Sequence, residues 1–336
     1  MSNAPHWIVV FGASAGGVES LRQLFRTLRA DLDAAFFVVL HVPPHSPSHL
    51  DQVRSSVTRM PVSAPTDRES FHRGHVYIAS ADQHLMLEPG LIRQTRGPKE
   101  CRVRPAIDVL FRSAAVAYGP RTIGIVLSGM LDDGTAGLWT VKDSGGLALV
   151  QDPRDAMHSP MPQSAIEHVK VDLVGTCDEL AGALGRIASK KAALTPQRSQ
   201  APWRCEEEVK IASEGNGLQL GLMNMGKVSQ YTCPDCHGVL VQIEEGSIVR
   251  FRCHTGHAFS LQTLLAEVNE SIDKGLWDTI RAIEERVLLL RQMSHLQSQS
   301  HTGKEPALDQ LADDAQASIK AIKELVLDAR LFGRQG

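Results

Sequence analysis

An α/β domain with a doubly wound, mostly parallel sheet is predicted for the first part of the chain. Continuous apolar runs rich in β-branched or aromatic residues, at 7–11, 36–40 and 122–127, alternate with amphipathic stretches. Strands that are buried on both faces of a sheet have this composition. Further along, three cysteines lie close together, and two long apolar stripes follow them. The sequence therefore predicts a sheet domain, then a small cysteine-containing module, then two α-helices.

The sheet domain is placed at residues 1–190, where apolar runs and amphipathic stretches alternate without interruption. Helices are expected between the runs, at residues 18–28, 106–117 and 136–144. Each predicted strand is thus followed by a predicted helix, which is the order that a parallel sheet with helices on both faces requires.

The composition changes after residue 190. Residues 191–228 contain few bulky apolar side chains and include lysines, prolines, serines and the acidic run 206–208. This composition is typical of a linker. The cysteine-containing module is placed after it, at residues 229–260.

Two helices are expected in the last segment, residues 261–336. The first, at 261–296, has apolar residues at steps of three and four, and Ser260 is well placed as its N-cap. A second apolar stripe runs from 308 to 326. The two helices are expected to pack on each other, and the alternative is a surface for a homodimer or for another partner.

Composition and charge exclude several functional classes. The chain has 336 residues, of which 43% are apolar and 22% are charged, and its formal net charge is -3. This balance gives no electrostatic reason to expect nucleic acid or an anionic membrane as a partner. The N-terminus lacks the pattern of a signal peptide, and no apolar run approaches the ~20 residues that span a bilayer. We expect a cytoplasmic protein that binds no nucleic acid and does not insert into a membrane.

Ser14 lies in a glycine-rich turn, Gly-Ala-Ser-Ala-Gly-Gly at residues 12–17, between the first predicted strand and helix. Backbone amides at a helix N-terminus can stabilise an oxyanion next to a nucleophile, and they can equally bind a phosphate. A dinucleotide site would have an acidic residue at the end of the second strand. That strand ends at His41 instead, which favours hydrolysis over the alternative of a nucleotide-binding protein.

A serine nucleophile needs an imidazole base, and the base needs a group that orients it. His41 follows the second strand as Ser14 follows the first, so adjacent strands would bring both to one edge of the sheet. The candidate carboxylates are Asp132 and Asp133, in a glycine-rich turn after the run 122–127, and one of them is expected only to cap a helix. The weaker candidates for the base are His45, His49 and His84.

Residues 7–190 resemble the catalytic domain of the bacterial chemotaxis protein-glutamate methylesterases. The resemblance implies that Ser14 is the nucleophile, His41 the base and Asp133 the orienting carboxylate. It also implies an oxyanion hole formed by the backbone N–H groups of Met130 and His41. The resemblance is carried by several blocks in the same order, at residues 12–17, 41–43, 74–79, 104–108, 128–137, 150–153 and 161–162.

The implied reaction is the hydrolysis of glutamate methyl esters on a helical, chemoreceptor-like protein, with no cofactor in catalysis. The family can also deamidate glutamine, and the sequence leaves open whether this chain does so. A non-catalytic signalling adaptor that acts through the C-terminal regions is the alternative. The joint presence of a serine, a histidine and an aspartate at the matching positions disfavours the adaptor.

Two departures from the family pattern matter. Leu131 stands where the family commonly has glycine, and a position that requires positive φ would strain a leucine. The first predicted strand starts at Trp7, so we expect no N-terminal phosphoacceptor domain of the kind common in the family. Control is therefore expected from a separate regulator or from the C-terminal regions.

The clustered cysteines form a motif typical of a zinc-ribbon-like site. Cys-Pro-Asp-Cys at 233–236 and Cys-His-Thr-Gly-His at 253–257 supply ligands suited to a closed, tetrahedral, structural zinc. For the fourth ligand His257 is preferred over His254, because its spacing lets the chain turn back towards the ion, and His237 is a weaker choice. The tail also resembles those of stand-alone family members, which implies docking, dimerisation or positioning of the helices. The predicted ligands are Cys233, Cys236, Cys253 and His257.

Overall fold

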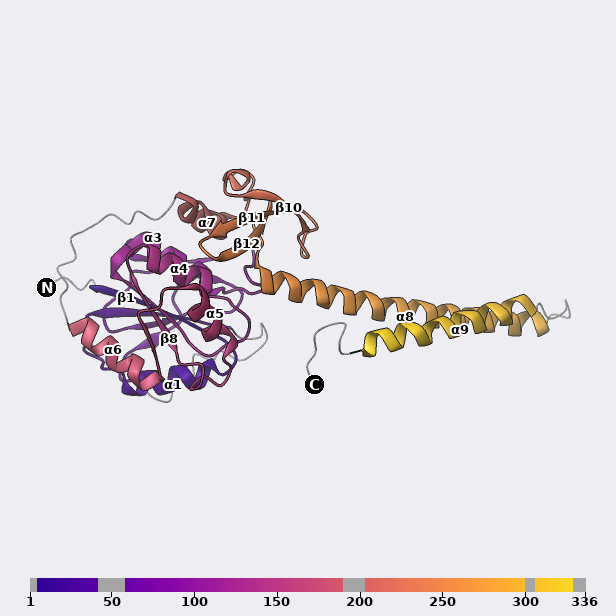
Figure 1. The fold of residues 1–336 in the computed structure, drawn as a ribbon, viewed down its shortest axis with the longest axis horizontal. Helices are drawn as coiled ribbons and strands as arrows, with labels where there is room; N and C mark the ends of the chain where they lie inside the picture. Colours follow the sequence, from indigo (N-terminus) through magenta and orange to yellow (C-terminus); the bar gives the residue numbers. More distant parts are fainter. Residues whose placement is uncertain (1–4, 42–57, 190–202, 300–305, 329–336) are drawn as a thin grey trace. The chain divides into compact units, whose positions relative to one another are not determined.

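The computed structural model describes residues 5–41, 58–189, 203–299 and 306–328 (Figure 1). The chain divides into two compact units, Met1–Leu264 and Leu265–Gly336. The first unit holds the sheet domain and the cysteine-containing module, and the second holds most of the first predicted helix and all of the second. We describe each unit separately.

A seven-stranded parallel sheet forms the centre of the first unit, in the order β3-β4-β2-β1-β7-β8-β9. The chain winds outwards in one direction from β1 and in the other direction from β7, so the order reverses between these two strands. This doubly wound arrangement confirms the predicted fold class. The strands are β1 Trp7–Ala13, β2 Ala34–Leu40, β3 Val62–Ser63, β4 Val76–Ile78, β7 Thr122–Val126, β8 Leu147–Gln151 and β9 Leu173–Gly175.

Helices cover both faces of the sheet (Figure 1). Alternate side chains of β1 point to opposite faces, so Phe11 packs in the cluster that includes α1 and α6, whereas Val10 packs in the cluster that includes α3, α4 and α5. A small antiparallel hairpin that the sequence did not predict completes the domain. These elements are α1 Gly17–Thr27, α3 Ile107–Tyr118, η1 Gly119–Arg121, α4 Thr135–Asp143, α5 Pro160–His168, α6 Cys177–Ser189, β5 His84–Glu88 and β6 Leu91–Thr95.

Part of the predicted linker is folded. Residues 203–214 form a helix whose side chains at Cys205, Glu208 and Ile211 are buried. The acidic run concealed this helix, because composition counts Glu208 as surface although buried arginines neutralise it. Together with the strands after it, the helix forms what we call the Cys/His module, residues 203–260. Its elements are α7 Trp203–Glu214, η2 Leu222–Asn224, β10 Lys227–Thr232, β11 Val239–Glu245, β12 Ile248–Cys253 and β13 Ala258–Ser260.

Ser260 caps the next helix, α8 Leu261–Gln299. Its Oγ accepts a hydrogen bond from the Thr263 N–H (3.0 Å), and the Ser260 N–H donates to Thr263 Oγ1 (2.8 Å). This reciprocal pair is a form of capping box, so the predicted N-cap is confirmed.

In the second unit, α8 packs against α9 Pro306–Leu327. Ile280 lies in one buried cluster with Ile319 and Val326, and Lys323 Nζ pairs with Glu284 Oε1 at 2.7 Å. The expected packing of the two helices on each other is therefore confirmed. Among the described residues, neither of these helices nor any other has the length and apolarity that crossing a membrane would require.

Candidate active site and metal centre

Ser14 lies at the carboxyl end of β1, at the point where the strand order of the sheet reverses. Its N–H donates to Ser128 O (2.9 Å), which connects the turn after β1 to the turn after β7. Gly16 has a φ of 73°, and a Cβ there would meet Met157 Cβ and Ser128 Oγ at 2.7 Å. Only glycine fits this turn. Binding sites of doubly wound folds lie at such a reversal, outside the carboxyl ends of the strands.

His41 follows β2 directly and lies beside the serine turn. Ala13 and Leu40 are register partners, so Ser14 and His41 are the next residues on two adjacent parallel strands. The imidazole is largely buried, and its Nε2 lies 2.8 Å from Asp133 Oδ2. Nε2 has no partner in full hydrogen-bond geometry within the described ranges, so the ring is close to the carboxylate but not aligned with it.

Backbone N–H groups at the starts of α3 and α4 each hold the carboxylate of an aspartate that belongs to the other helix or to the turn before it. Asp133 Oδ2 accepts a hydrogen bond from the Ile107 N–H (2.8 Å) and its Oδ1 accepts one from the Asp108 N–H (3.1 Å), both in the first turn of α3. In return, Asp108 Oδ1 accepts from the N–H groups of Gly134 (3.0 Å) and Gly137 (2.7 Å) at the start of α4. Helix dipoles favour a charged carboxylate at these positions. The orientation of Asp133 is therefore fixed by α3.

Burial raises the pKa values of the two neighbouring aspartates, Asp108 and Asp132. Burial, and then the charge of Asp133, raise the pKa of Asp108 to about 7. Burial also raises the pKa of Asp132 to about 6, although a hydrogen bond from Ser260 opposes the shift. Of the adjacent aspartates in this turn, Asp133 is the one beside His41, whereas Asp132 accepts the Ser260 hydroxyl at 2.7 Å.

The turn that carries the expected oxyanion donor is strained at Leu131, whose φ is 60°. A left-handed conformation costs a non-glycine residue roughly 1–2 kcal/mol. The prediction that Leu131 would be strained if its position requires a positive φ is thus confirmed. His41 does not fit its expected oxyanion role, because its N–H donates to Ala13 O (3.0 Å) in the strand ladder. The hydrogen bonds of the parallel sheet continue to the His41 N–H, and the position of His41 after the strand does not predict this from the sequence.

The other candidate bases lie elsewhere. His84 is buried away from the serine turn, with Nε2 2.9 Å from Pro98 O and Nδ1 accepting the Ala106 N–H at 3.2 Å. Both ring nitrogens of His84 are therefore occupied by backbone groups. His45 and His49 lie outside the described residues.

Two residues that support the site received no role from the sequence. Ser128 Oγ donates to Ala15 O (2.8 Å) and accepts from the His158 N–H (2.9 Å), which holds the serine turn in place. Asp108 supports Asp133 as described above. Ser128 and Asp108 both lie in the blocks that carried the family resemblance. The sequence signal for Asp108 was its position as an aspartate in the first turn of a helix.

The predicted metal ligands come together in the Cys/His module. Their ligand atoms all lie within 4.8 Å of one another. Cys236 Sγ is 3.6 Å from Cys253 Sγ, and His257 Nδ1 is 3.6 Å from Cys253 Sγ and 3.7 Å from Cys233 Sγ. A tetrahedral zinc with Zn–S about 2.3 Å and Zn–N about 2.05 Å requires edges of about 3.8 and 3.6 Å. The four residues thus fit a zinc ion.

Neither alternative histidine belongs to this group. His254 packs beside Gly238 instead, where a Cβ would meet its Nδ1 at 2.2 Å. His237 has a φ of 58° in the turn after Cys236. The donor set is therefore three thiols and one imidazole, which is suited to a metal such as zinc.

Comparisons with known proteins find relatives of the sheet domain. A relative from Leptospira interrogans is 33% identical over 174 residues, which are 52% of this chain and 90% of the relative. Protein-glutamate methylesterase/protein-glutamine glutaminase 1 of Geobacter metallireducens is 33% identical over 177 residues, but the match covers only 48% of that protein. The crystal structure of the Thermotoga maritima CheB methylesterase catalytic domain matches with a TM-score of 0.51 and 33% identity, over 54% of this chain and 98% of that one.

The family described as CheB methylesterase matches residues 9–184, which form the sheet domain and contain Ser14, His41 and Asp133. The match covers more than half of the chain. The protein therefore belongs to the CheB methylesterase family.

Proposed function

We propose that this chain hydrolyses glutamate methyl esters on a helical, chemoreceptor-like protein, with Ser14, His41 and Asp133 as its catalytic triad. The observation that carries the proposal is the position of His41, directly beside the serine turn and with Nε2 2.8 Å from Asp133 Oδ2. Membership of the methylesterase family supports the same reaction.

The geometry supports a role for each of these side chains. Because Nε2 faces Asp133, Nδ1 of His41 is the nitrogen that takes the proton as Ser14 Oγ attacks the ester carbonyl. The charge on Asp133, held by the amides of α3, stabilises the imidazolium that forms. The Met130 N–H is proposed as an oxyanion donor, without the His41 N–H, which is engaged in the sheet.

The acyl-enzyme then completes the cycle. The imidazolium returns its proton to the leaving methoxide, so methanol departs and the glutamyl group remains on Ser14. Water, deprotonated by His41, attacks the acyl carbon and releases glutamate with a restored serine hydroxyl. Deamidation of glutamine follows the same steps with ammonia as the leaving group. We propose it as a second activity, since relatives carry protein-glutamine glutaminase in their names.

The metal is proposed to be a structural zinc. Three thiolates and one imidazole would fill its tetrahedral positions, which leaves none for substrate or water. All catalytic steps are therefore assigned to side chains of the sheet domain, and the ion would stabilise the Cys/His module. The free cysteines at this site suit a reducing compartment, which supports action in the cytoplasm.

The second unit is proposed to mediate association. Apolar side chains of α8, among them Leu288, Leu289 and Met293, remain exposed although α9 packs on the helix. A homodimer through these helices would cover such side chains. A separate regulator is proposed to control the esterase. The net charge of -3 gives no support for nucleic acid as a partner, and no insertion into a membrane is proposed.

The test is methanol release from a methylated receptor fragment. Ser14→Ala is expected to lower the rate by several orders of magnitude, because the acyl-enzyme cannot form. Ser189→Ala, the same change at an exposed serine of α6, serves as the matched control and is expected to retain the wild-type rate. Equal release from wild type and Ser14→Ala would refute the proposed nucleophile.

A further inference from the structure

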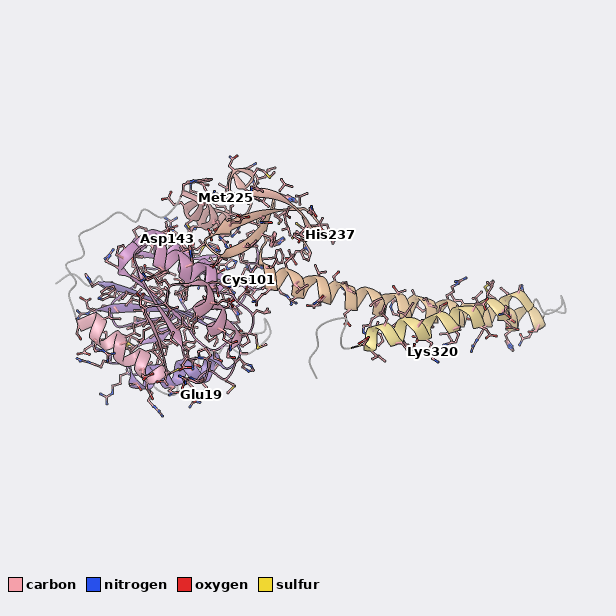
Figure 2. The ribbon with its side chains drawn as sticks, viewed as in Figure 1. Glu19, Cys101, Asp143, Met225, His237 and Lys320 are labelled. Carbon is pink, nitrogen blue, oxygen red and sulfur yellow. The ribbon has the colours of Figure 1, made fainter. Side chains whose placement is uncertain are left out.

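The Cys/His module is joined to the sheet domain by backbone and side-chain hydrogen bonds. The Cys101 N–H donates to Ala258 O (2.9 Å), and the Ala258 N–H donates to Lys99 O (3.2 Å). Thr95 Oγ1 donates to Ala212 O at 3.1 Å. Figure 2 shows Cys101 at this junction, next to the part of the chain that carries Met225 and His237. The module is therefore packed on the catalytic domain and not merely tethered to it.

One hydroxyl of the module reaches the catalytic turn. Ser260 Oγ accepts the capping hydrogen bond from the Thr263 N–H, and its own proton goes to Asp132 Oδ1 at 2.7 Å. Asp132 immediately precedes Asp133, and the Thr135 N–H donates to Asp132 O (3.1 Å) within the same turn. The N-cap of α8 and the turn that holds the catalytic carboxylate thus share one hydrogen bond, between residues 128 positions apart.

A second connection runs through Arg112 of α3. Its guanidinium is buried, pairs with Glu100, and lies 3.9 Å from Glu208 Oε2 and 4.0 Å from Asp108 Oδ2. Arg112 lies one turn after Asp108, whose N–H holds Asp133. The first turn of α3 is therefore attached to a buried charge network.

The module supplies the other half of that network. Glu208 of α7 forms a bidentate pair with Arg250 of β12, with both N–O distances at 2.8 Å. Arg252 of the same strand contacts Glu208 Oε1 (3.2 Å) and Glu100 Oε1 (2.7 Å). Buried charges tolerate only arrangements in which each one keeps its partners. A displacement of the module or of α3 would therefore leave buried charges without their partners, which disfavours other placements.

We propose that Ser260 and Glu208 are positioning residues of the esterase, which fix the aspartate turn and the first turn of α3 and thereby hold Asp133 against His41. The proposal rests on the proposed function, in which Asp133 orients the base. A displacement of about 1 Å at a catalytic group can cost about 100-fold in rate. Ser260 and Glu208 thus act on catalysis through the placement of Asp133.

The experiment compares variants of the zinc-loaded full chain in methanol release. Ser260→Ala and Glu208→Gln are expected to lower kcat about 10–100-fold and to leave KM nearly unchanged, because the triad is misaligned while the substrate surface is intact. Ser260→Thr is expected to keep kcat near the wild-type value, since threonine retains the hydroxyl. The matched controls are Ser298→Ala on α8 and Glu206→Gln on α7, and both are expected to behave as wild type.

A double-mutant cycle separates this role from capping of α8. If Ser260 acts on catalysis through Asp132, Asp132→Ala and Ser260→Ala lower kcat by similar factors, and the double variant loses no more than either single one. Independent, multiplicative losses would overturn the proposed path. Circular dichroism shows whether Glu208→Gln folds. If it does not fold, the double-mutant cycle of Ser260 and Asp132 tests the proposal without it.

Labelling by a fluorophosphonate distinguishes failure of the proposal from failure of the proposed function. An activated serine displaces fluoride from the probe and forms a phosphonyl ester, so the labelling rate of Ser14 reports triad alignment without any receptor. Slower labelling of Ser260→Ala than of wild type and Ser298→Ala supports the proposal. Equal kcat and equal labelling in folded variants overturn it and leave the esterase standing. A wild type that neither releases methanol nor labels at Ser14 refutes both.

Discussion

The sheet domain and the junction beneath the Cys/His module bury opposite kinds of side chain. Strands β1 and β2 are buried along their whole length and are composed of apolar residues and glycine. At the junction, the fully buried side chains include Arg112, Arg252 and Glu208. Apolar burial stabilises in proportion to area and tolerates changes of shape, whereas a buried ion network adds little net stability and tolerates no missing partner.

The difference explains how a small module could hold a catalytic turn. The module's buried apolar residues form two small clusters. One includes Leu240, Phe251 and Phe259 beside the candidate metal ligands, and the other includes Ile211 and Ile243. Such a segment gains much of its stability from a bound metal. The sheet is therefore expected to provide most of the stability, and the module with its charge network is proposed to provide a fixed geometry.

Removing the metal is expected to have the largest effect, and to act on the module and on the turns that contact it while the strands of the sheet stay folded. His257→Ala is predicted to abolish stoichiometric zinc binding and to expose the amides of β11 and β12, because structural zinc contributes on the order of 10 kcal/mol in isolated zinc modules. The amides of β1 and β2 should stay protected. The measurements are elemental analysis and hydrogen exchange by mass spectrometry.

His254→Ala is the matched control, because this histidine is a near neighbour outside the ligand group. It should retain the zinc. Loss of zinc from His254→Ala but not from His257→Ala would show that the fourth ligand is misassigned.

Truncation of the apolar core should act on the whole domain. Phe36→Ala in β2 removes a ring buried from solvent in the cluster with Phe11 and Phe25. It is predicted to cost about 3–5 kcal/mol of unfolding free energy, against under about 1.5 kcal/mol for Phe36→Leu. Urea unfolding measures both, and similar costs for the two variants would mean that this core is less tightly packed than described.

The buried acid of α3 should make stability depend on pH. Burial and the charge of Asp133 raise the pKa of Asp108 to about 7 in the folded state, above the ~3.9 of an unfolded aspartate. The folded protein then binds more protons between these values. The contribution of Asp108 to stability is therefore complete below about pH 4 and is lost as pH rises towards about 7.

Asp108→Asn should weaken this dependence, since the amide oxygen can still accept from Gly134 and Gly137 but cannot titrate. Urea midpoints at pH 5 and pH 7.5 provide the check. An identical fall in both proteins would show that other groups cause it.

The smallest effect is expected at the strained turn. Leu131→Gly removes the left-handed strain at φ 60° but adds freedom to the unfolded chain. The net gain is predicted to be about 1 kcal/mol or less. Thermal unfolding is the measurement, and a clear loss of stability would indicate that the leucine side chain makes contacts that outweigh the strain.

Features set by local sequence could be predicted, whereas those set by distant partners could not. The strands β1, β2 and β7 and the cap at Ser260 follow from residue patterns a few positions long. Positive φ at Leu131 was foreseen as a risk from the same kind of evidence. The clustering of the four candidate metal ligands also followed from their short spacings in the sequence.

The buried charge network between the sheet domain and the Cys/His module could not be predicted from the sequence. Glu208 reads as part of an exposed acidic run until Arg250, 42 positions away, is known to neutralise it. Asp132 and Asp133 are adjacent and chemically equal, so the residues alone do not distinguish them. In the structure Asp133 lies beside His41, whereas Asp132 accepts the Ser260 hydroxyl. The family resemblance implied that the His41 amide belongs to the oxyanion hole, and nothing in the local sequence shows that this N–H donates to Ala13 O instead.

The most direct test of the account is therefore a comparison of these two aspartates in methanol release from a methylated receptor fragment. Asp133→Asn is predicted to lower kcat about 10³–10⁴-fold, because it removes the charge that orients and stabilises the imidazole. Asp132→Asn is predicted to cost at most about 100-fold, since it disturbs only the placement of the turn. Full activity of Asp133→Asn, or an equal loss in both variants, would contradict the account.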